Sequence, residues 1–288
     1  MEASKYSVFL KVAETGSISR AAEALQYTQS GVSHAIKALE RELDIKLFIR
    51  KRNGVELTEN GRRVIPYVRA LLRDEQDLKA FTYNINNKVE GRLRVGSFSS
   101  VTGFWMPDAV VYFQQHYPDV ELEILDGNYD EIRQWILQGV ADLGFLSSIA
   151  ADGLKFQPLY DDPLCVIMPK GHPLEQAESV CLDEVCRYPM ILETPGCDND
   201  IVKLLEENGK HPPSRFNFRD DFEIAAFVER GIGISITQEL VQKSIHADLV
   251  VKPLSFHRVR TIGIGRLKTQ NSLLSSLFLR YMQDYLAH

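Results

Sequence analysis

Several features that mark common protein classes are missing from this chain of 288 residues. No run approaches the roughly 18 consecutive apolar residues that a membrane-spanning helix requires. The opening residues, MEASKYSVFLKVAETG, lack the basic stretch and the apolar stretch of a secretory signal peptide. We therefore expect these residues to belong to the folded protein and the protein to be cytoplasmic.

Cysteine is also scarce, and its spacing excludes familiar metal sites. The four cysteines, Cys165, Cys181, Cys186 and Cys197, form no CxxC pair and no CxxC…HxxxH pattern. Reduced thiols in a reducing compartment are the default interpretation of such a set. The spacing predicts no metal site.

Motifs of the common enzyme classes are absent as well. The sequence contains no GxSxG, no GxxxxGK[ST], no HExxH and no Gly-rich dinucleotide fingerprint. The run GIGIS, Gly231 to Ser235, lies between a predicted helix and a predicted strand, which is the wrong order for holding a phosphate. We therefore expect neither an enzyme nor a bound cofactor.

Charge is present but unevenly distributed. The net charge is −6, yet residues 1–63 contain 11 Lys and Arg against 8 Asp and Glu. The excess of acidic residues lies in the remainder of the chain. A slightly basic head on an acidic body suggests that only the head meets a polyanion.

The stretch TQSGVSHAIKALE, Thr28 to Glu40, is typical of a two-sided helix. Val32, Ile36 and Leu39 recur at helical spacing, which predicts a stripe facing a core. A merely solvated opposite face would more usually carry Glu and Lys at i,i+4 spacing. Here that face is small, amide-bearing or weakly basic, and consists of Gln29, Ser30, Ser33, His34 and Lys37. This face is a candidate contact surface.

A tight turn separates this helix from a short one before it. A helix over residues 5–14 ends at Gly16, Ser17 or Ser19 can cap SRAAEAL, and Thr28 can cap the next helix. This layout is the helix-turn-helix, whose second helix lies in the DNA major groove. The expected DNA contacts are Ser19, Arg20, Thr28, Gln29, Ser30, Ser33, His34 and Lys37.

Each of these side chains suits a groove or a backbone contact. Gln29 can pair bidentately with adenine, while His34 and Lys37 can reach guanine or the backbone. The serines can bond to bases or phosphates, and a helix N-terminus favours phosphate. Gly31 allows a close approach, at a cost in helix propensity of about 1 kcal/mol relative to Ala.

A basic hairpin follows this helix. KLFIR and VELT read as short strands around Asn53-Gly54, which is a strong local hairpin signal. Arg50, Lys51 and Arg52 precede this turn. Such a tip can lie on the sugar-phosphate backbone as a wing that positions the protein without reading sequence. A solvated loop is the alternative.

Residues 58–88 form one long helical pattern. An apolar seam with two polar members steps by four and three: Val64, Val68, Leu71, Glu75, Leu78, Thr82 and Ile85. This heptad spacing favours a linker helix that pairs with a second copy, and Pro66 can bend its first turns. A surface helix packed on its own domain is the alternative.

The rest of the chain, from Gly91, alternates strand-like and helix-like runs. Strands RLRVGSF, VELEIL and ADLGFL alternate with helices over 103–116 and YDEIRQWILQG. LKFQPLY and PLCVIMP read as two successive strands, and a last helix spans about Asn271–Leu286. Such alternation predicts parallel sheets with helices on both faces, in two lobes with a cleft between them.

Residues Phe9 to Gly61 resemble the winged helix-turn-helix of the LysR-type transcriptional regulators. The matching pieces are VAETGS, AAEAL, TQSGVS, I..LE.EL…LF.R and LTENG, at consistent spacing through the domain. The family often has Pro or Ala after SQ, where this chain has Ser30 and Gly31. That departure concerns the bases read, not the mode of docking.

The resemblance implies an α/β multidomain protein. It would comprise a winged helix-turn-helix domain (residues 1–58), a dimerising linker helix (59–90) and an effector domain (91–288) resembling type 2 periplasmic binding proteins. Lobe one would be 91–161 and 262–288, and lobe two 162–261. The implied function is sequence-specific binding of double-stranded DNA as a homodimer or homotetramer, controlled by a small molecule between the lobes.

The best effector-site candidate is GSFSSVTG, where a strand end runs into a helix. Its hydroxyls and free N–H groups could bind an anion, although helix capping is the alternative. Glu193 and Asp221 could equally select an amine or hydroxyls. The expected ligand contacts are Ser97, Ser99, Ser100, Val101 and Thr102 from the GSFSSVTG run, and, by topology, Ser147, Ser148, Glu193, Thr194 and Phe222 facing it.

A redox sensor is the alternative function. Cys181, Cys186 and Cys197 fall in the predicted second lobe, where a thiol switch of the kind found in peroxide-responsive family members could lie. Buried structural thiols are the commoner explanation of such cysteines.

Overall fold

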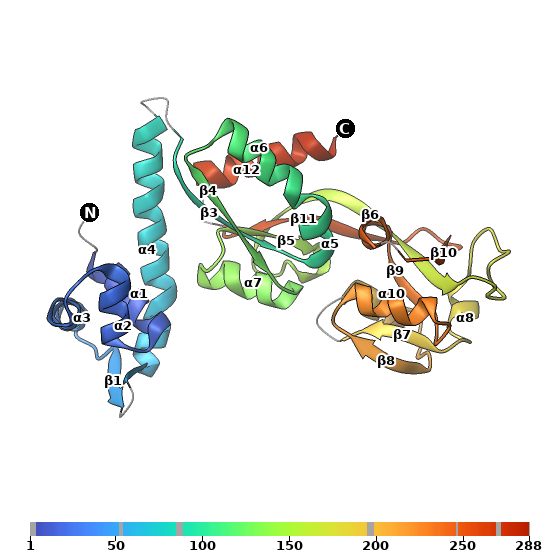
Figure 1. Cartoon of the computed structure of the whole chain (residues 1–288), viewed down its shortest axis with the longest axis horizontal. Helices are drawn as coiled ribbons and strands as arrows, with labels where there is room; N and C mark the ends of the chain where they lie inside the picture. The colour runs from blue at the N-terminus through green and yellow to red at the C-terminus, as the bar shows by residue number, and fades with distance from the viewer. Residues whose placement is uncertain are drawn as a thin grey trace. The chain divides into compact units, whose positions relative to one another are not determined.

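The structure is a computed structural model that describes residues 4–51, 54–84, 89–194, 199–245, 247–268 and 272–287 (Figure 1). The chain divides into two compact units, residues 1–88 and residues 89–288. Within the described residues, no helix is both long and apolar enough to cross a membrane.

The N-terminal unit begins with three capped helices, α1 (Lys5–Thr15), α2 (Ile18–Leu25) and α3 (Gln29–Leu43). Side-chain oxygens of Ser4, Ser17 and Thr28 accept hydrogen bonds from the backbone N–H groups of the first turns. Left-handed residues Gly16, Gln26 and Asp44 end the three helices. The predicted helix-turn-helix is confirmed, with Thr28 as the cap of its second helix.

A hairpin and a long helix complete this unit. Strands β1 (Phe48–Lys51) and β2 (Gly54–Leu57) pair antiparallel, with Phe48 opposite Leu57 and Lys51 opposite Gly54. This confirms the predicted hairpin, while Arg52 and Asn53 lie outside the described residues. Helix α4 (Glu59–Asn84) follows and contains Pro66.

The core of the N-terminal unit uses the stripe expected of α3. Val32 and Leu39 are fully buried and Ile36 nearly so, packed against Val8 and Phe9 of α1. This burial leaves the opposite face of α3 to solvent. The sequence pattern therefore identified correctly which side of the helix faces inward.

The heptad seam of α4 divides into two parts. Val68 is buried in the core of its own unit, so packing on its own domain describes the first turns. Leu71 and Leu78 are exposed, as is Tyr67 at 77%. The side chain of Thr82 and the whole of Ile85 lie outside the described residues. The apolar surface open to a partner thus begins near the middle of the helix.

The first lobe of the C-terminal unit is built on a mixed sheet. Strand β3 (Gly91–Ser97) pairs parallel with β4 (Val120–Asp126) and β5 (Leu143–Ser147). Helices α6 (Met106–His116) and α12 (Leu273–Leu286) lie on one side of these strands and α7 (Tyr129–Gln138) on the other (Figure 1). The main hydrophobic core lies between these layers.

Two long strands continue from this lobe into the second. Strand β6 (Lys155–Pro169) and strand β11 (Val259–Arg266) pair antiparallel, and β11 also pairs antiparallel with β5. Among the described strands the order is β10-β6-β11-β5-β3-β4, with β9 also paired to β6. The expected parallel pairing therefore holds for β3 with β4 and β5, whereas the crossover strands β6 and β11 run antiparallel.

The second lobe packs around its own core on the far part of β6. Strands β7 and β8 form a separate parallel pair. The elements of the second lobe are α8 (Leu182–Val185), β7 (Met190–Glu193), α9 (Asn199–Glu207), β8 (Ser214–Phe218), α10 (Asp221–Glu229), β9 (Ser235–Gln238), α11 (Glu239–Ser244) and β10 (Leu249–Pro253).

Two further sequence expectations need correction. LKFQPLY and PLCVIMP form the single strand β6, because β11 pairs along it from Lys155 to Pro163 and a register shift absorbs the irregularity. The helix expected over 103–116 is two helices, α5 (Ser99–Phe104) and α6, which meet at Trp105 with a proline at the start of α6.

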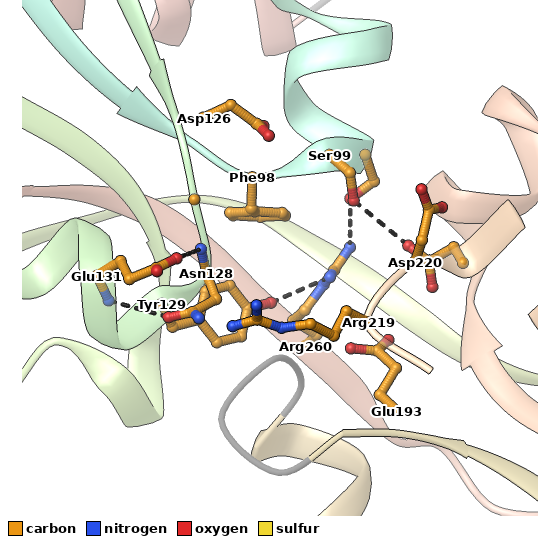
Figure 2. A pocket seen from close by; sticks show the side chains of 13 residues that line it. Phe98, Ser99, Asp126, Asn128, Tyr129, Glu131, Glu193, Arg219, Asp220 and Arg260 are labelled. Atoms are coloured by element: carbon orange, nitrogen blue, oxygen red, sulfur yellow. Dashed lines mark hydrogen bonds between the residues drawn. The ribbon is translucent and has the colours of Figure 1, made fainter. Parts of the chain in front are cut away.

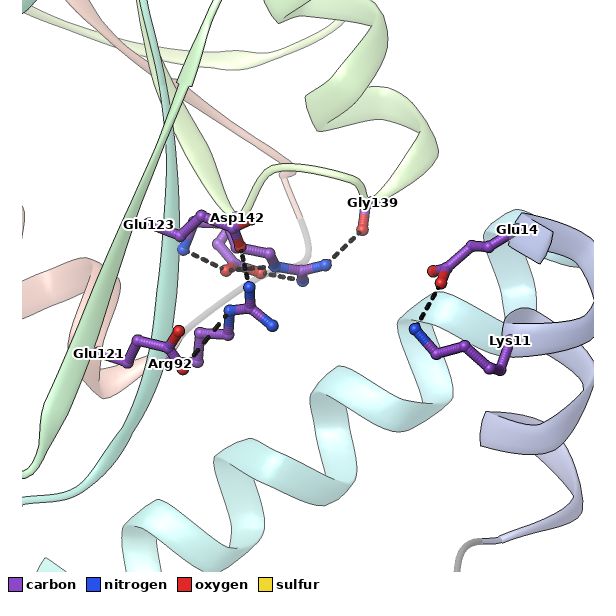
Figure 3. Close-up of polar contacts among 8 residues, drawn as sticks. Lys11, Glu14, Arg92, Glu121, Glu123, Gly139 and Asp142 are labelled. Atoms are coloured by element: carbon purple, nitrogen blue, oxygen red, sulfur yellow. Dashed lines mark hydrogen bonds and ion pairs between the residues drawn. The ribbon is translucent and has the colours of Figure 1, made fainter. Parts of the chain in front are cut away.

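An ion pair fastens the start of β5 to β3. Arg94 donates through Nη2 to Asp142 Oδ1 at 2.8 Å and through Nε to Oδ2 at 3.1 Å (Figure 3). The backbone N–H of Arg94 also donates to Asp142, at 2.9 Å. Because Asp142 is buried and bonded on both oxygens, this pair helps to fix the amino end of β5 against β3.

Candidate functional site

The first candidate site is the outward face of α3. Gln29, Ser30, His34 and Lys37 are all exposed, opposite the buried Val32–Leu39 stripe. The start of α3 is fixed by Thr28, whose Oγ1 accepts from the N–H of Gly31 at 3.1 Å and lies 3.0 Å from Ser30 Oγ. The helix therefore presents its N-terminal donors and acceptors on a fixed frame.

Gly31 has an explanation inside the molecule that sequence reasoning missed. A Cβ at this position would lie 3.2 Å from Thr28 Oγ1 and 3.7 Å from Tyr27. That separation is tight for a carbon next to a capping hydroxyl. A side chain at this position would therefore press on the capping hydroxyl, which would have to shift by a few tenths of an ångström.

The hairpin lies against α3 and encloses a small hollow. Ser33, Lys37 and Arg50 line a cavity of about 240 Å³ together with Lys46 and Phe48. Ser33 is half-buried there, unlike its exposed neighbours on α3. The structure thus brings the predicted reading face and the predicted wing to one surface.

The remaining predicted DNA contacts of the N-terminal unit lie on β1 and at the start of α2. Arg50 and Lys51 are exposed on β1, and Lys51 Nζ lies 3.5 Å from a Glu56 oxygen. Ser19 and Arg20 are exposed at the start of α2, where the Arg20 guanidinium donates to the Thr15 carbonyl. Arg52 lies outside the described residues.

The second candidate site is a pocket of about 330 Å³ in the C-terminal unit (Figure 2). Its walls come from the carboxyl ends of β3, β4, β7 and β8, where ligands of α/β proteins commonly bind. Residues of both lobes line it: Phe98, Ser99, Ser100, Asp126, Gly127, Asn128, Tyr129, Glu131, Glu193, Arg219, Asp220, Asp221 and Arg260.

Three of the ten predicted ligand contacts line this pocket: Ser99, Ser100 and Glu193. Val101 is instead in the hydrophobic core, and Phe222 is 68% exposed away from the lining. The other predicted contacts outside the lining are Ser97, Thr102, Ser147, Ser148 and Thr194. Sequence reasoning named Asp221 but missed the rest of the polar runs after β4 and β8, although their positions at strand ends could have indicated them.

A buried arginine forms one wall of the pocket. Arg260 Nη2 donates to Asp162 Oδ2 at 2.6 Å and to Ser100 Oγ at 3.2 Å, and Nη1 donates to the Tyr129 hydroxyl at 3.0 Å. Its guanidinium also lies 5.1 Å from the centre of the Phe98 ring. This group joins β11, β6, α5 and α7 at the point where the two lobes meet.

Carboxylates dominate the remaining lining. Ser99 Oγ donates to Asp221 Oδ2 at 3.4 Å, and Asp220 caps α10 by accepting from the N–H of Phe222 at 2.8 Å. Burial raises the pKa of Asp126, and nearby Asp220 and Glu131 raise it further, whereas Thr102 opposes the rise. Since Asp162 already pairs with Arg260, the lining carries an excess of negative charge.

The described part of the chain holds no group of three or more His, Cys, Asp or Glu residues arranged to bind a metal ion.

The described cysteines differ from one another in burial. Cys165 is buried, which raises the pKa of its thiol to about 12. Burial likewise raises the pKa of the Cys186 thiol, while Cys181 is free and half-buried. Cys197 lies outside the described residues.

A helix-turn-helix with a basic hairpin, joined to a two-lobed unit with a polar pocket, defines a DNA-binding regulator that responds to a small molecule. Residues 4–62 match the bacterial regulatory helix-turn-helix family of LysR type, and residues 86–287 match the LysR substrate binding domain. The chain belongs to the LysR family of transcriptional regulators.

Individual relatives agree with this assignment. The chain is 30% identical over 289 residues to YvbU of Bacillus subtilis (strain 168), an uncharacterized HTH-type transcriptional regulator, covering 99% of this chain and 98% of that protein. A full-length OxyR variant from Pseudomonas aeruginosa has a TM-score of 0.79 at 21% identity, covering 98% of this chain and 94% of that one. CbnR in complex with its target DNA has a TM-score of 0.67 at 19% identity, covering 99% of each chain. The two structural likenesses show the fold.

Proposed function

We propose that this LysR-type regulator reads its operator through the N-terminal half of α3 and is positioned on the backbone by the β1–β2 hairpin. The observation that supports this most is the exposed polar face of α3, with Gln29 and His34 at its start. Side chains of this kind at the start of a second helix reach base edges in the major groove. The structural likeness to CbnR, which was solved with its target DNA, supports the same docking.

The chemistry of the side chains indicates which residues contact bases and which contact phosphates. Gln29, Ser30, Ser33, His34 and Lys37 face bases, while Ser19, Arg20, Thr28, Arg50, Lys51 and Arg52 contact phosphates. Phosphate contacts position a protein without reading sequence. An anisotropy titration of duplex from upstream of its own gene tests this, with scrambled duplex as the control. Equal affinity for both duplexes would contradict base reading by α3.

We further propose that the pocket between the lobes holds the effector. Its lining offers five carboxylates against two arginines, of which Arg260 is already paired with Asp162. That chemistry favours a ligand rich in hydrogen-bond donors or positive charge over the anion that the α5 serines suggested. A thermal-shift screen of small amines, amino acids and carboxylates tests this preference. Stabilisation by carboxylates alone would contradict it.

The assembly and setting are inferred from the same features. The exposed Leu71, Leu78 and Tyr67 of α4 support a homodimer through the linker helix, and the family implies a homotetramer. With domain limits near residues 58 and 90, this helix would connect the DNA-binding domain to the effector domain. A regulator that acts on bacterial DNA works in the cytoplasm, and we infer that it has no catalytic activity of its own.

A further inference from the structure

One carboxylate on α3 holds the base of the hairpin. Glu40 accepts hydrogen bonds through Oε1 from the backbone N–H groups of Leu47, at 2.8 Å, and Phe48, at 3.4 Å. Its other oxygen accepts from Lys46 Nζ at 2.9 Å. The Glu40 side chain is only 10% exposed, whereas that of Lys46 is 79% exposed. Since Phe48 begins β1, this carboxylate joins α3 to the strand that carries Arg50 and Lys51.

The residues at the start of the linker helix α4 hydrogen-bond to the same segment, residues 46–48. Thr58 Oγ1 donates to the Lys46 carbonyl at 2.6 Å, and the Thr58 N–H donates to the Leu47 carbonyl at 2.9 Å. The same hydroxyl accepts from the N–H of Gly61, in the first turn of α4, at 2.9 Å. Residues 46–48 are therefore the junction of α3, the hairpin and α4.

Gly61 allows this junction to close. A Cβ at Gly61 would lie 2.3 Å from the Leu47 carbonyl oxygen, which is a backbone atom with little freedom to move. Only glycine lets the first turn of α4 pack directly on the residues that Glu40 holds. The first turn of α4 therefore packs directly on the backbone of Leu47, with no room for a side chain between them.

Glu40 is ionised in this setting. Burial alone would raise its pKa, but the hydrogen bonds from Lys46, Leu47 and Phe48 outweigh that effect and lower the pKa below its usual value. Hydrogen bonds to an ionised acceptor are about twice as strong as neutral ones. An anion on the DNA-binding helix would otherwise oppose docking on a polyanion, so its presence points to a role in holding the hairpin.

We propose that Glu40 is a positioning residue for DNA binding, which sets the place of Arg50 and Lys51 relative to α3 through the backbone of Leu47 and Phe48. This inference rests on the proposed function of the hairpin as a wing. Glu40 itself contacts no DNA. Its loss releases the wing from the reading helix, so phosphate contacts are lost while base reading is retained.

Two variants test this role, Glu40→Ala and Thr58→Val, which open the junction from opposite sides. Glu42→Ala is the matched control, since it removes the same charge from the same helix. Glu42 pairs with Lys5 and with the Tyr6 hydroxyl of α1, and not with the hairpin. Glu40→Gln is the conservative rescue, because its amide oxygen can still accept from the Leu47 N–H.

The measurement is the salt dependence of duplex binding by the full chain. Anisotropy titrations use upstream and scrambled duplexes over a series of salt concentrations, at a temperature where circular dichroism shows each variant folded. Each lost phosphate contact reduces the log–log slope by about 0.9. We expect Glu40→Ala and Thr58→Val to lose about 1–2 units of slope, with an unchanged ratio of affinities for the two duplexes. Glu40→Gln and Glu42→Ala keep the wild-type slope.

Several results would overturn the proposal. A wild-type slope in Glu40→Ala with only a lower melting temperature would make Glu40 purely structural. An equal slope change in Glu42→Ala would assign the effect to net charge. If Glu40→Ala does not fold, a wild-type salt slope in Thr58→Val would contradict a role of this junction in positioning the hairpin. Absence of salt-dependent binding by the wild-type chain would instead refute the proposed function itself.

Discussion

The two candidate sites of this chain have opposite charge and opposite construction. The reading surface comes from adjacent stretches of sequence and presents uncharged donors with the cations Lys37, Arg50 and Lys51. The pocket is assembled from five separate segments, and its lining has five carboxylates against two arginines. The proposed DNA-binding surface and the proposed effector pocket are therefore chemically distinct, so we expect substitutions at one site to leave the intrinsic affinity of the other site unchanged.

The largest effect is expected from Arg260→Ala. This change leaves the Asp162 carboxylate buried without its cation, which typically costs about 3–5 kcal/mol. Chemical denaturation should show the C-terminal unit unfolding much earlier. Arg219→Ala, which alters an exposed arginine of the same lining, is the control and should change little. Equal losses in both variants would contradict the central role of the buried pair.

The next largest effect concerns the reading surface. Gln29→Ala should lose roughly 1–3 kcal/mol of discrimination at one base position. Arg50→Ala and Arg52→Ala should instead weaken binding evenly across sequences and reduce the salt slope. Competition titrations with single-base operator variants measure both quantities. If Gln29→Ala and Arg50→Ala behaved alike, the division between reading helix and positioning hairpin would be wrong.

A smaller effect is expected in the pocket. Glu193→Gln should weaken binding of a cationic effector by roughly 1 kcal/mol, because it removes one half-buried negative charge. Asp130→Asn, on α7 outside the lining, is the charge-matched control. Calorimetry with the amine selected by the thermal-shift screen measures the difference. Tighter binding after Glu193→Gln would assign the pocket to anions.

A modest pH effect should appear in the N-terminal unit. Because folding lowers the pKa of Glu40 below 4.5, its contribution is fully present above pH 4.5 and is lost as the pH falls through the folded value. Acid titration of α3 helicity should therefore reveal extra loss of stability in wild type compared with Glu40→Gln. Identical acid profiles would show that the carboxylate contributes nothing through its charge.

The smallest effect is expected from oxidation. Burial keeps the Cys165 thiol protonated, and Cys186 is shifted the same way, so both should react slowly with peroxide. Mass spectrometry after mild peroxide should show no reversible disulfide. A reversible Cys181–Cys186 or Cys197 disulfide that alters DNA binding would favour the redox-sensing alternative.

How much the sequence predicts differs between the two sites. Capping residues, the turn at Gln26 and the stripe of α3 are local, so their pattern identifies the reading surface directly. The pocket depends on chain pairing that no local pattern records. No sequence motif marks Arg260, and only its antiparallel pairing opposite Asp162 places it beside Ser100.

The same reason explains the errors in the fold. LKFQPLY and PLCVIMP read as two strands, yet they form the continuous strand β6, which β11 pairs with up to Pro163 and β9 and β10 pair with beyond it. GSFSSVTG suggested an anion site, but the residues it faces come from the second lobe and include Asp221. Periodicity predicts the elements well, while the partners of each element depend on contacts far apart in sequence.

The most direct test of DNA reading by this chain is an anisotropy titration of the upstream duplex with the wild-type protein across salt concentrations. We expect specific binding whose log affinity falls linearly and steeply with log salt, as several phosphate contacts require. A folded protein whose duplex binding is absent, or indifferent to salt and sequence, would contradict the proposed function.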